Sequence, residues 1–125
     1  MAGLFKFGTI TYASTGVKTI TCGWQPLGAE FTVEPGPGST YTTIERSVGV
    51  TDGTNQNCTQ EFTDPSRSRM ERFTDRLADI RKWNSGTSSY DQKYQTALDS
   101  FTATEVKHNL TVNDTTYQLR YKIWG

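Results

Sequence analysis

The chain has one histidine, His108, and histidine is the residue type best suited to acid–base chemistry near neutral pH. A catalytic histidine needs a nucleophile or a carboxylate beside it in space, and such a triad is recognised by geometry rather than by a lone residue. His108 shares its parity with Val106 and Leu110 in an alternating segment. This position favours a histidine on the covered face of a strand, and we predict no catalytic residue.

Oxygen-bearing side chains could support two further kinds of chemistry, glycoside hydrolysis and calcium binding. Hydrolysis of a glycosidic bond needs two carboxylates that face each other across a cleft, but the 13 acidic residues are scattered along the chain. Segment 50–57, VTDGTNQN, has oxygen donors at alternate positions, yet it lacks the closing glutamate of an EF-hand loop. We interpret the carboxylates as solvated charges and this segment as a turn.

Metal and redox chemistry has little support in the sequence. Cys22 and Cys58 lack the spacing of a zinc motif, and His108 alone cannot complete a site with them. Segment 1–14 has no basic stretch followed by a long apolar one, so we expect no secretory signal. Two reduced thiols are then favoured, although one disulfide stays open. We predict no metal ion and no cofactor.

Charge and hydropathy argue against two classes of partner. The 13 basic residues balance the 13 acidic ones, so nothing marks the whole chain as a nucleic-acid binder. Residues 67–82 hold six basic and three acidic residues, and this small excess favours a solvated face or a salt-bridged subunit contact. We expect no nucleic-acid partner and no membrane span, since no stretch of about 18 apolar residues occurs.

Aromatic side chains are the remaining candidates for binding. Large rings dominate subunit contacts as well as cores, and exposed coplanar rings can stack on a sugar. Both uses stay open at this point. The candidates for an interface or for stacking on a ligand are Trp24, Trp83, Trp124, Tyr90 and Tyr94.

The elements that would position these residues are β-strands. The chain has 21 threonines among valine, isoleucine, tyrosine and phenylalanine, which suit a pleated, half-buried surface. Apolar and polar residues alternate over short segments, and glycine- or proline-rich turns such as 35–39 separate them. The clearest strands span about 4–12, 17–24, 29–35, 40–53, 55–62, 106–112 and 117–123.

One region also has a helical pattern. Four apolar residues from Met70 to Ile80 recur at spacings of 3, 4 and 3, which is typical of one face of a helix. Asp64 followed by Pro65 is typical of a helix start. A loop and one short helix near 65–76 are therefore both open.

A hairpin should follow this region. Residues 84–86, NSG, are a turn signal, and the aromatic residues Trp83 and Tyr90 flank it. We predict pairing of 76–83 with 88–99. With the other strands this predicts an all-β chain, a single domain over 1–125, folded as an antiparallel two-sheet sandwich of jelly-roll-like topology.

Three segments resemble the "GF-x-P" modules of bacteriophage tail fibres and other virion proteins. In these modules a strand ends in glycine, an aromatic residue, any residue and proline, which is CGWQPLGAEFTV at 22–33 here. SVGVTDGTNQN at 47–57 and the tyrosine-rich ending at 99–125 are similar to their later segments. The chain differs from the family pattern at Trp24, where phenylalanine is usual, and at 105–106, Glu-Val, where Gly-Phe is common.

The resemblance implies a small β-sandwich with a structural or host-recognition role, and it carries over no catalytic residue. We predict a non-enzymatic virion protein, made in the host cytoplasm, that assembles with itself and with other virion proteins. It would be a capsid decoration or a tail or fibre component. The alternative is a carbohydrate- or receptor-binding module that mediates host attachment through a surface glycan.

Overall fold

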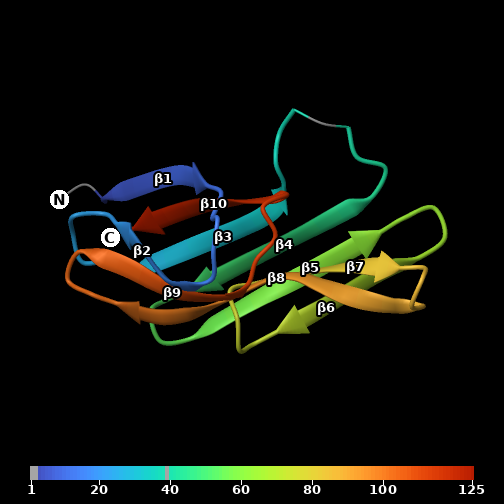
Figure 1. Ribbon diagram of the computed structural model, residues 1–125. Coiled ribbons are helices and arrows are strands. Elements are labelled where there is room, and N and C mark those ends of the chain that lie inside the picture. Colours follow the sequence, from blue (N-terminus) through green and yellow to red (C-terminus); the bar gives the residue numbers. More distant parts are fainter. Residues whose placement is uncertain (1–2, 39) are drawn as a thin grey trace.

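Ten β-strands form two antiparallel sheets that pack face to face in the computed structural model (Figure 1). Residues 3–38 and 40–125 are described, so the last residue of the predicted loop 35–39 lies outside the described residues. The predicted two-sheet sandwich is confirmed. Within the described ranges no helix forms, and accordingly none is long and apolar enough to cross a membrane. The strands are β1 (Phe5–Ile10), β2 (Gly16–Thr21), β3 (Gly28–Pro35), β4 (Ile44–Thr51), β5 (Gln56–Thr63), β6 (Ser68–Phe73), β7 (Ala78–Asn84), β8 (Ser89–Phe101), β9 (Glu105–Val112) and β10 (Tyr117–Trp124).

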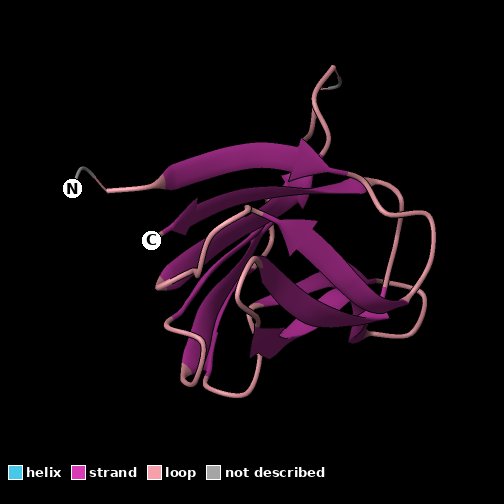
Figure 2. Ribbon diagram, turned by 90° about the vertical axis from the view of Figure 1, so that its left-hand side faces the viewer, coloured by secondary structure: helices cyan, strands magenta, loops and turns pink. Residues whose placement is uncertain are grey.

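The two sheets differ in width. The larger sheet has the strand order β1-β10-β3-β4-β5-β6, and the smaller sheet has the order β2-β9-β8-β7. The chain passes between the sheets after β1, β2, β6 and β9, so the first two strands lie beside the last two, as in jelly-roll winding. Strands β3 to β6 and β7 to β9 instead follow one another as meanders. Figure 2, turned by 90°, shows the two layers.

The core lies between the sheets and is filled from alternate positions of the strands. Along β10 the residues Tyr117, Leu119, Tyr121 and Ile123 point inward, while those between them point outward. Strand β9 alternates in the same way, with Val106 fully buried. The parity predicted for the segment around His108 is confirmed. Each large aliphatic side chain buried in this way contributes about 1.5–3 kcal/mol relative to an exposed one.

Both alternatives for 65–76, a loop and a short helix, are wrong for most of the segment, because Ser68–Phe73 forms the edge strand β6. Strand β6 pairs antiparallel with β5, so its backbone groups bond to a neighbouring strand rather than along a helix. The Asp64 carboxylate accepts hydrogen bonds from the backbone N–H groups of Ser66 and Arg67, at 2.8 and 2.7 Å, and so caps a turn. The helical spacing joined residues of two strands, β6 and β7, that belong to different sheets.

The predicted hairpin in this region is confirmed. Strand β7 pairs antiparallel with β8, and Trp83 lies directly opposite Tyr90 in the register. The side chain of Asn84 accepts a hydrogen bond from the backbone N–H of Gly86 at 2.9 Å, which stabilises the turn. The hairpin therefore brings two of the candidate aromatic residues together.

Candidate interaction surface

Strand β4 points its apolar residues outward and its polar residues toward the core. Ile44, Val48 and Val50 have 54, 40 and 40% of their surface exposed. The inward residues Glu45 and Ser47 are buried. Because successive side chains of a strand face opposite sides, burying one set leaves the other on the surface. An aliphatic row therefore lies on the solvent side of the larger sheet.

Other strands of the larger sheet also expose apolar side chains on this side, although the outward polar residues of β10 and β3 lie between β1 and β4. On the edge strand β1, Phe5 and Phe7 are 56 and 72% exposed, and their ring centroids lie 5.8 Å apart. The strand register places them on the same side of the sheet as the aliphatic row of β4. Exposed apolar groups that gather on one face of a protein mark candidate interaction sites. We call this surface the broad face; its exposed apolar members are Phe5, Phe7, Ile44, Val48, Val50, Met70 and Trp124.

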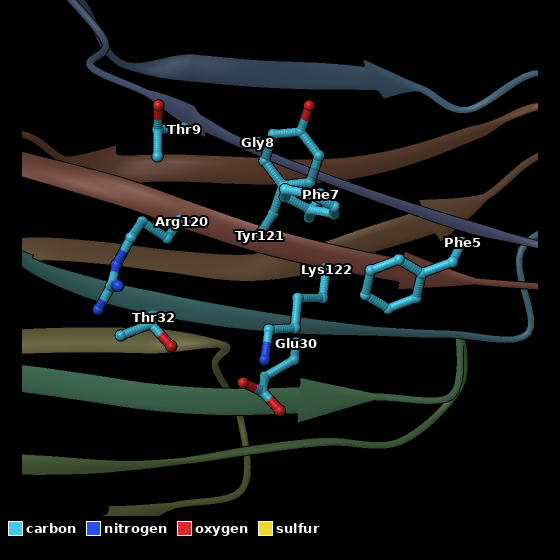
Figure 3. Close-up of a pocket in the computed structure, with 9 residues that line it drawn as sticks. All are labelled: Phe5, Phe7, Gly8, Thr9, Glu30, Thr32, Arg120, Tyr121 and Lys122. Atoms are coloured by element: carbon cyan, nitrogen blue, oxygen red, sulfur yellow. The ribbon is translucent and has the colours of Figure 1, made fainter.

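A groove of about 660 Å³ lies on the broad face beside β1 (Figure 3). Phe5 and Phe7 of β1 line it together with Arg120 and Lys122 of β10 and Glu30 of β3. Lys122 and Glu30 are directly opposite each other in the register of β10 and β3. The groove therefore offers a partner both apolar contact and charged groups of either sign.

Two ion pairs lie on the broad face. A guanidinium nitrogen of Arg46 lies 3.5 Å from a carboxylate oxygen of Glu61 on the neighbouring strand. Arg120 of β10 pairs in the same way with Glu34 of β3. Exposed ion pairs contribute little to stability, but they lower the cost of covering the charges with another protein. The broad face thus suits a partner that is apolar and nearly neutral.

Both edge strands of the larger sheet carry a cation at an inward position. Lys6 of β1 donates a hydrogen bond to the backbone carbonyl of Thr21. On β6, a guanidinium nitrogen of Arg69 lies 3.5 Å from the side-chain amide oxygen of Gln60. The guanidinium carbon also lies over the ring of Tyr90, 5.0 Å from the ring centre. Inward-pointing charges protect sheet edges from pairing with another chain. We therefore expect protein contacts at the broad face rather than at these edges.

The outward side of the smaller sheet is more polar. It presents Thr19 of β2 and Lys107, Asn109 and Thr111 of β9, and the exposed Val17 interrupts this polar surface. The two outer faces of the sandwich therefore differ in hydropathy. The apolar character of the broad face is a local property and not one of the whole surface.

Two of the predicted tryptophans lie near the ends of strands at one end of the sandwich. Trp124 is 37% exposed on the broad face, and its ring covers Gly28, where an added Cβ would lie 2.3 Å from a ring carbon. Trp24 is half-buried and packs against the core. It follows Gly23, whose φ of +85° turns the chain sharply after β2. Trp124 is therefore an interface candidate, while Trp24 fills a corner.

The other three predicted aromatics do not reach the broad face. Trp83 and Tyr90 meet edge-to-face, with ring centroids 5.2 Å apart, and Tyr90 also packs against Phe62. The Arg67 guanidinium lies 4.0 Å from the centre of the Trp83 ring. Tyr94 is 1% exposed in the core and presents no ring to a partner. The five aromatic candidates thus do not form one common site.

His108 is buried in the core, as its parity predicted. Its Nε2 lies 3.0 Å from the hydroxyl of Tyr12, and its Nδ1 lies 2.6 Å from the hydroxyl of Thr96. The ring meets Phe31 edge-on at a centroid distance of 4.9 Å. Burial, assisted by Lys18, lowers the pKa of His108 to about 4. With both ring nitrogens engaged by hydroxyl groups, His108 acts as a structural residue.

Acidification should destabilise the protein through His108. The folded state holds the pKa at about 4, whereas an unfolded histidine has a pKa of about 6.5. The stabilisation is complete above the unfolded pKa and decreases as the pH falls toward the folded one. We expect a loss of about 2 kcal/mol between pH 7.5 and pH 5, measured from urea unfolding. His108→Gln should reduce this difference, and an equal loss in both proteins would contradict the assignment.

Comparison of the chain with protein-family models, curated proteins and solved structures gave no match. In the described part of the chain, no group of three or more His, Cys, Asp or Glu side chains is placed to hold a metal ion. Cys22 and Cys58 are both buried and do not form a disulfide.

Proposed function

We propose that the protein is a non-enzymatic structural component of a bacteriophage particle and that it assembles with copies of itself through the broad face. The exposed apolar residues of the larger sheet carry the proposal of assembly. The place in a particle, as a capsid decoration or a tail or fibre component, rests on the resemblance of segments 22–33, 47–57 and 99–125 to virion modules. If mass spectrometry does not detect the protein in purified particles of the phage that encodes it, the proposed place in a particle is wrong.

A second copy fits the chemistry of the broad face. Two ion pairs, Arg46–Glu61 and Arg120–Glu34, lie within the face, so these four charges need no partner from a second copy. A symmetric contact would use the same apolar residues on both copies. A standard interface takes roughly 800 Å² from each partner, which is about an eighth of the 6740 Å² surface of this chain. A face six strands wide can supply that area.

The positions of the groups best suited to catalysis support a non-enzymatic role. His108 bonds to two hydroxyl groups inside the core. Asp79, which is fully buried, pairs with Arg76 and Arg81 at 2.8 and 2.9 Å. These side chains are held by bonds that stabilise the fold, and they contact one another rather than a substrate cleft.

The solution mass tests the assembly. We expect the protein to be an oligomer by light scattering after size exclusion, and Val48→Arg to weaken association by about tenfold or more, because an unpaired charge would be buried at the contact. Val48 is 40% exposed and lies between Thr32 and Thr59, so the substitution should leave the fold intact.

A matched arginine on the other sheet is the control for this experiment. Thr19→Arg lies on the outward side of the smaller sheet and should leave the mass unchanged. A wild-type monomer at every concentration, or a Val48→Arg oligomer as stable as the wild type, would contradict assembly through the broad face.

A further inference from the structure

A second recess lies at one end of the sandwich, where the segment before β4, the β7–β8 hairpin and the β9–β10 turn converge. Its volume is about 360 Å³, and residues from both sheets line it. We call it the end cleft. It shares no lining residue with the groove on the broad face. A ligand in the end cleft would therefore leave that groove unoccupied.

Two buried groups line the inner part of the end cleft. Glu45 and Tyr117 are 4 and 3% exposed, and the hydroxyl of Tyr117 donates a hydrogen bond to the Glu45 carboxylate. The hydroxyl of Thr43 donates to the same carboxylate at 2.8 Å. Burial and this carboxylate raise the pKa of Tyr117, so its hydroxyl keeps its proton. This part of the cleft is fixed before any ligand arrives.

Polar groups of both signs line the rest of the end cleft. A carboxylate oxygen of Asp91 accepts a hydrogen bond from the side-chain amide of Asn84 at 2.9 Å, which holds Asp91 in place. The pKa of Asp114 is lowered chiefly by the backbone N–H of Thr116 and also by Lys93 and Lys82. No ion pair within 4 Å involves either lysine among the described residues. Their ammonium groups are therefore free to donate to a ligand.

Aromatic rings complete the lining. Trp83 contributes a wall, and its orientation is fixed because Arg67 stacks on its ring and Tyr90 meets it edge-on. Tyr41, which is 43% exposed, also lines the cleft. The end cleft thus combines aromatic rings, one of them held in place, with hydrogen-bond donors and acceptors.

We propose that the end cleft binds a saccharide. Sugar hydroxyls act as donors and acceptors at once, which matches the carboxylates of Asp91 and Asp114 and the ammonium group of Lys93, while the C–H faces of a sugar ring can pack on Trp83. A purely apolar ligand would leave these charges desolvated, and a simple anion would be repelled by the carboxylates. The volume lies at the lower end for small-molecule sites and fits a short saccharide.

Binding to four sugars tests this proposal: glucose, galactose, N-acetylglucosamine and glucuronic acid. At least one should bind with a dissociation constant in the millimolar range or below, followed by tryptophan fluorescence and by saturation-transfer NMR. Asp91→Asn keeps an oxygen that can accept from Asn84 but removes the charge. It should weaken binding by about tenfold, as expected for loss of a hydrogen bond to a charged group, and Lys93→Ala should weaken it similarly.

Two controls make the outcome decisive. Lys107→Ala removes a cation from the outward side of the smaller sheet and should bind as the wild type does. Val48→Arg should also bind normally, so a failure of assembly through the broad face and a failure of the end cleft are distinguishable. No binding by any of the four sugars, or binding that Asp91→Asn and Lys93→Ala both leave unchanged while the variants stay folded, would overturn the proposal.

Discussion

Replacing Asp79 by alanine should destabilise the protein by about 3–5 kcal/mol. Asp79 has no exposed side-chain surface, and its carboxylate accepts hydrogen bonds from Arg76, Arg81 and Gln92 at 2.8, 2.9 and 2.8 Å. The side chains of Arg76 and Arg81 are only 14 and 28% exposed, so water can replace the lost carboxylate only in part. The free energy of unfolding from urea titration at neutral pH measures the effect.

Asp75 provides a control on the same arginine. Its carboxylate oxygens lie 2.8 and 3.1 Å from the Arg76 guanidinium, but its side chain is 70% exposed. Exposed ion pairs typically contribute at most about 1 kcal/mol, so Asp75→Ala should have a small effect. Equal losses in the Asp75 and Asp79 variants would show that burial does not determine the strength of this cluster.

Replacing Gly49 by alanine should cost about 3 kcal/mol, the upper end of the usual range for overpacking. An added Cβ would lie 1.8 Å from the carbonyl oxygen of Leu77 and 2.7 Å from its carbonyl carbon. Both atoms belong to the backbone and cannot rotate away. Strand β4 would have to move away from the segment that leads into β7, which would separate the two sheets locally. The free energy of unfolding of the variant measures this cost.

Gly36 is the matched control for a methyl group added to a glycine. An added Cβ there would lie 3.7 Å from the carbonyl oxygen of Thr116, which is an ordinary contact. Gly36→Ala should therefore change the free energy of unfolding by no more than about 0.5 kcal/mol. If Gly49→Ala is equally mild, the sheets are not in close contact at β4.

The close contact at β4 also accounts for the broad face. Besides Gly49, the inward residue Ser47 accepts a hydrogen bond from the backbone N–H of Asp79 at 3.1 Å. These inward positions must be small or polar because backbone of the other sheet lies directly against them. The apolar side chains of β4, such as Val48, are consequently outside the core. The structure thus leaves them available for contact with another protein.

The strands that are easiest to predict from the sequence are those in which the apolar residues of the strand's own alternation are also its buried residues. In β9 and β10 the apolar parity is also the buried parity, so alternation alone is enough to indicate inward residues such as Leu110 and Leu119. In β4 the alternation was found, but its direction was not evident. The direction depends on the backbone of Leu77 and Asp79, which lies against Gly49 and Ser47 and leaves room only for small or polar side chains. These two residues lie about 30 positions further along the chain, so the pattern within β4 does not reveal them.

Local pattern also failed where a segment bridges two sheets. The apolar spacing from Met70 to Ile80 is typical of a helix, but Met70 is 73% exposed on an edge strand and Ile80 is buried in the other sheet. Sheet pairing overrode local spacing.

The same limit applies to the aromatic candidates, because composition identifies large rings but not which of them the fold leaves exposed. Phe5 and Phe7, the most exposed rings of the broad face, were recognised only as members of a strand.

Protection of a single introduced cysteine tests the central claim, contact between copies through the broad face, most directly. The native Cys22 and Cys58 are buried, and burial raises the pKa of Cys58 to about 11, so an introduced surface thiol should dominate labelling. The maleimide labelling rates of Val48→Cys and Thr19→Cys would be compared in dilute and in concentrated protein. We predict that concentration slows labelling at position 48 several-fold and leaves position 19 unchanged. Equal rates at both positions in assembled protein, or protection of position 19 instead, would contradict the proposed contact surface.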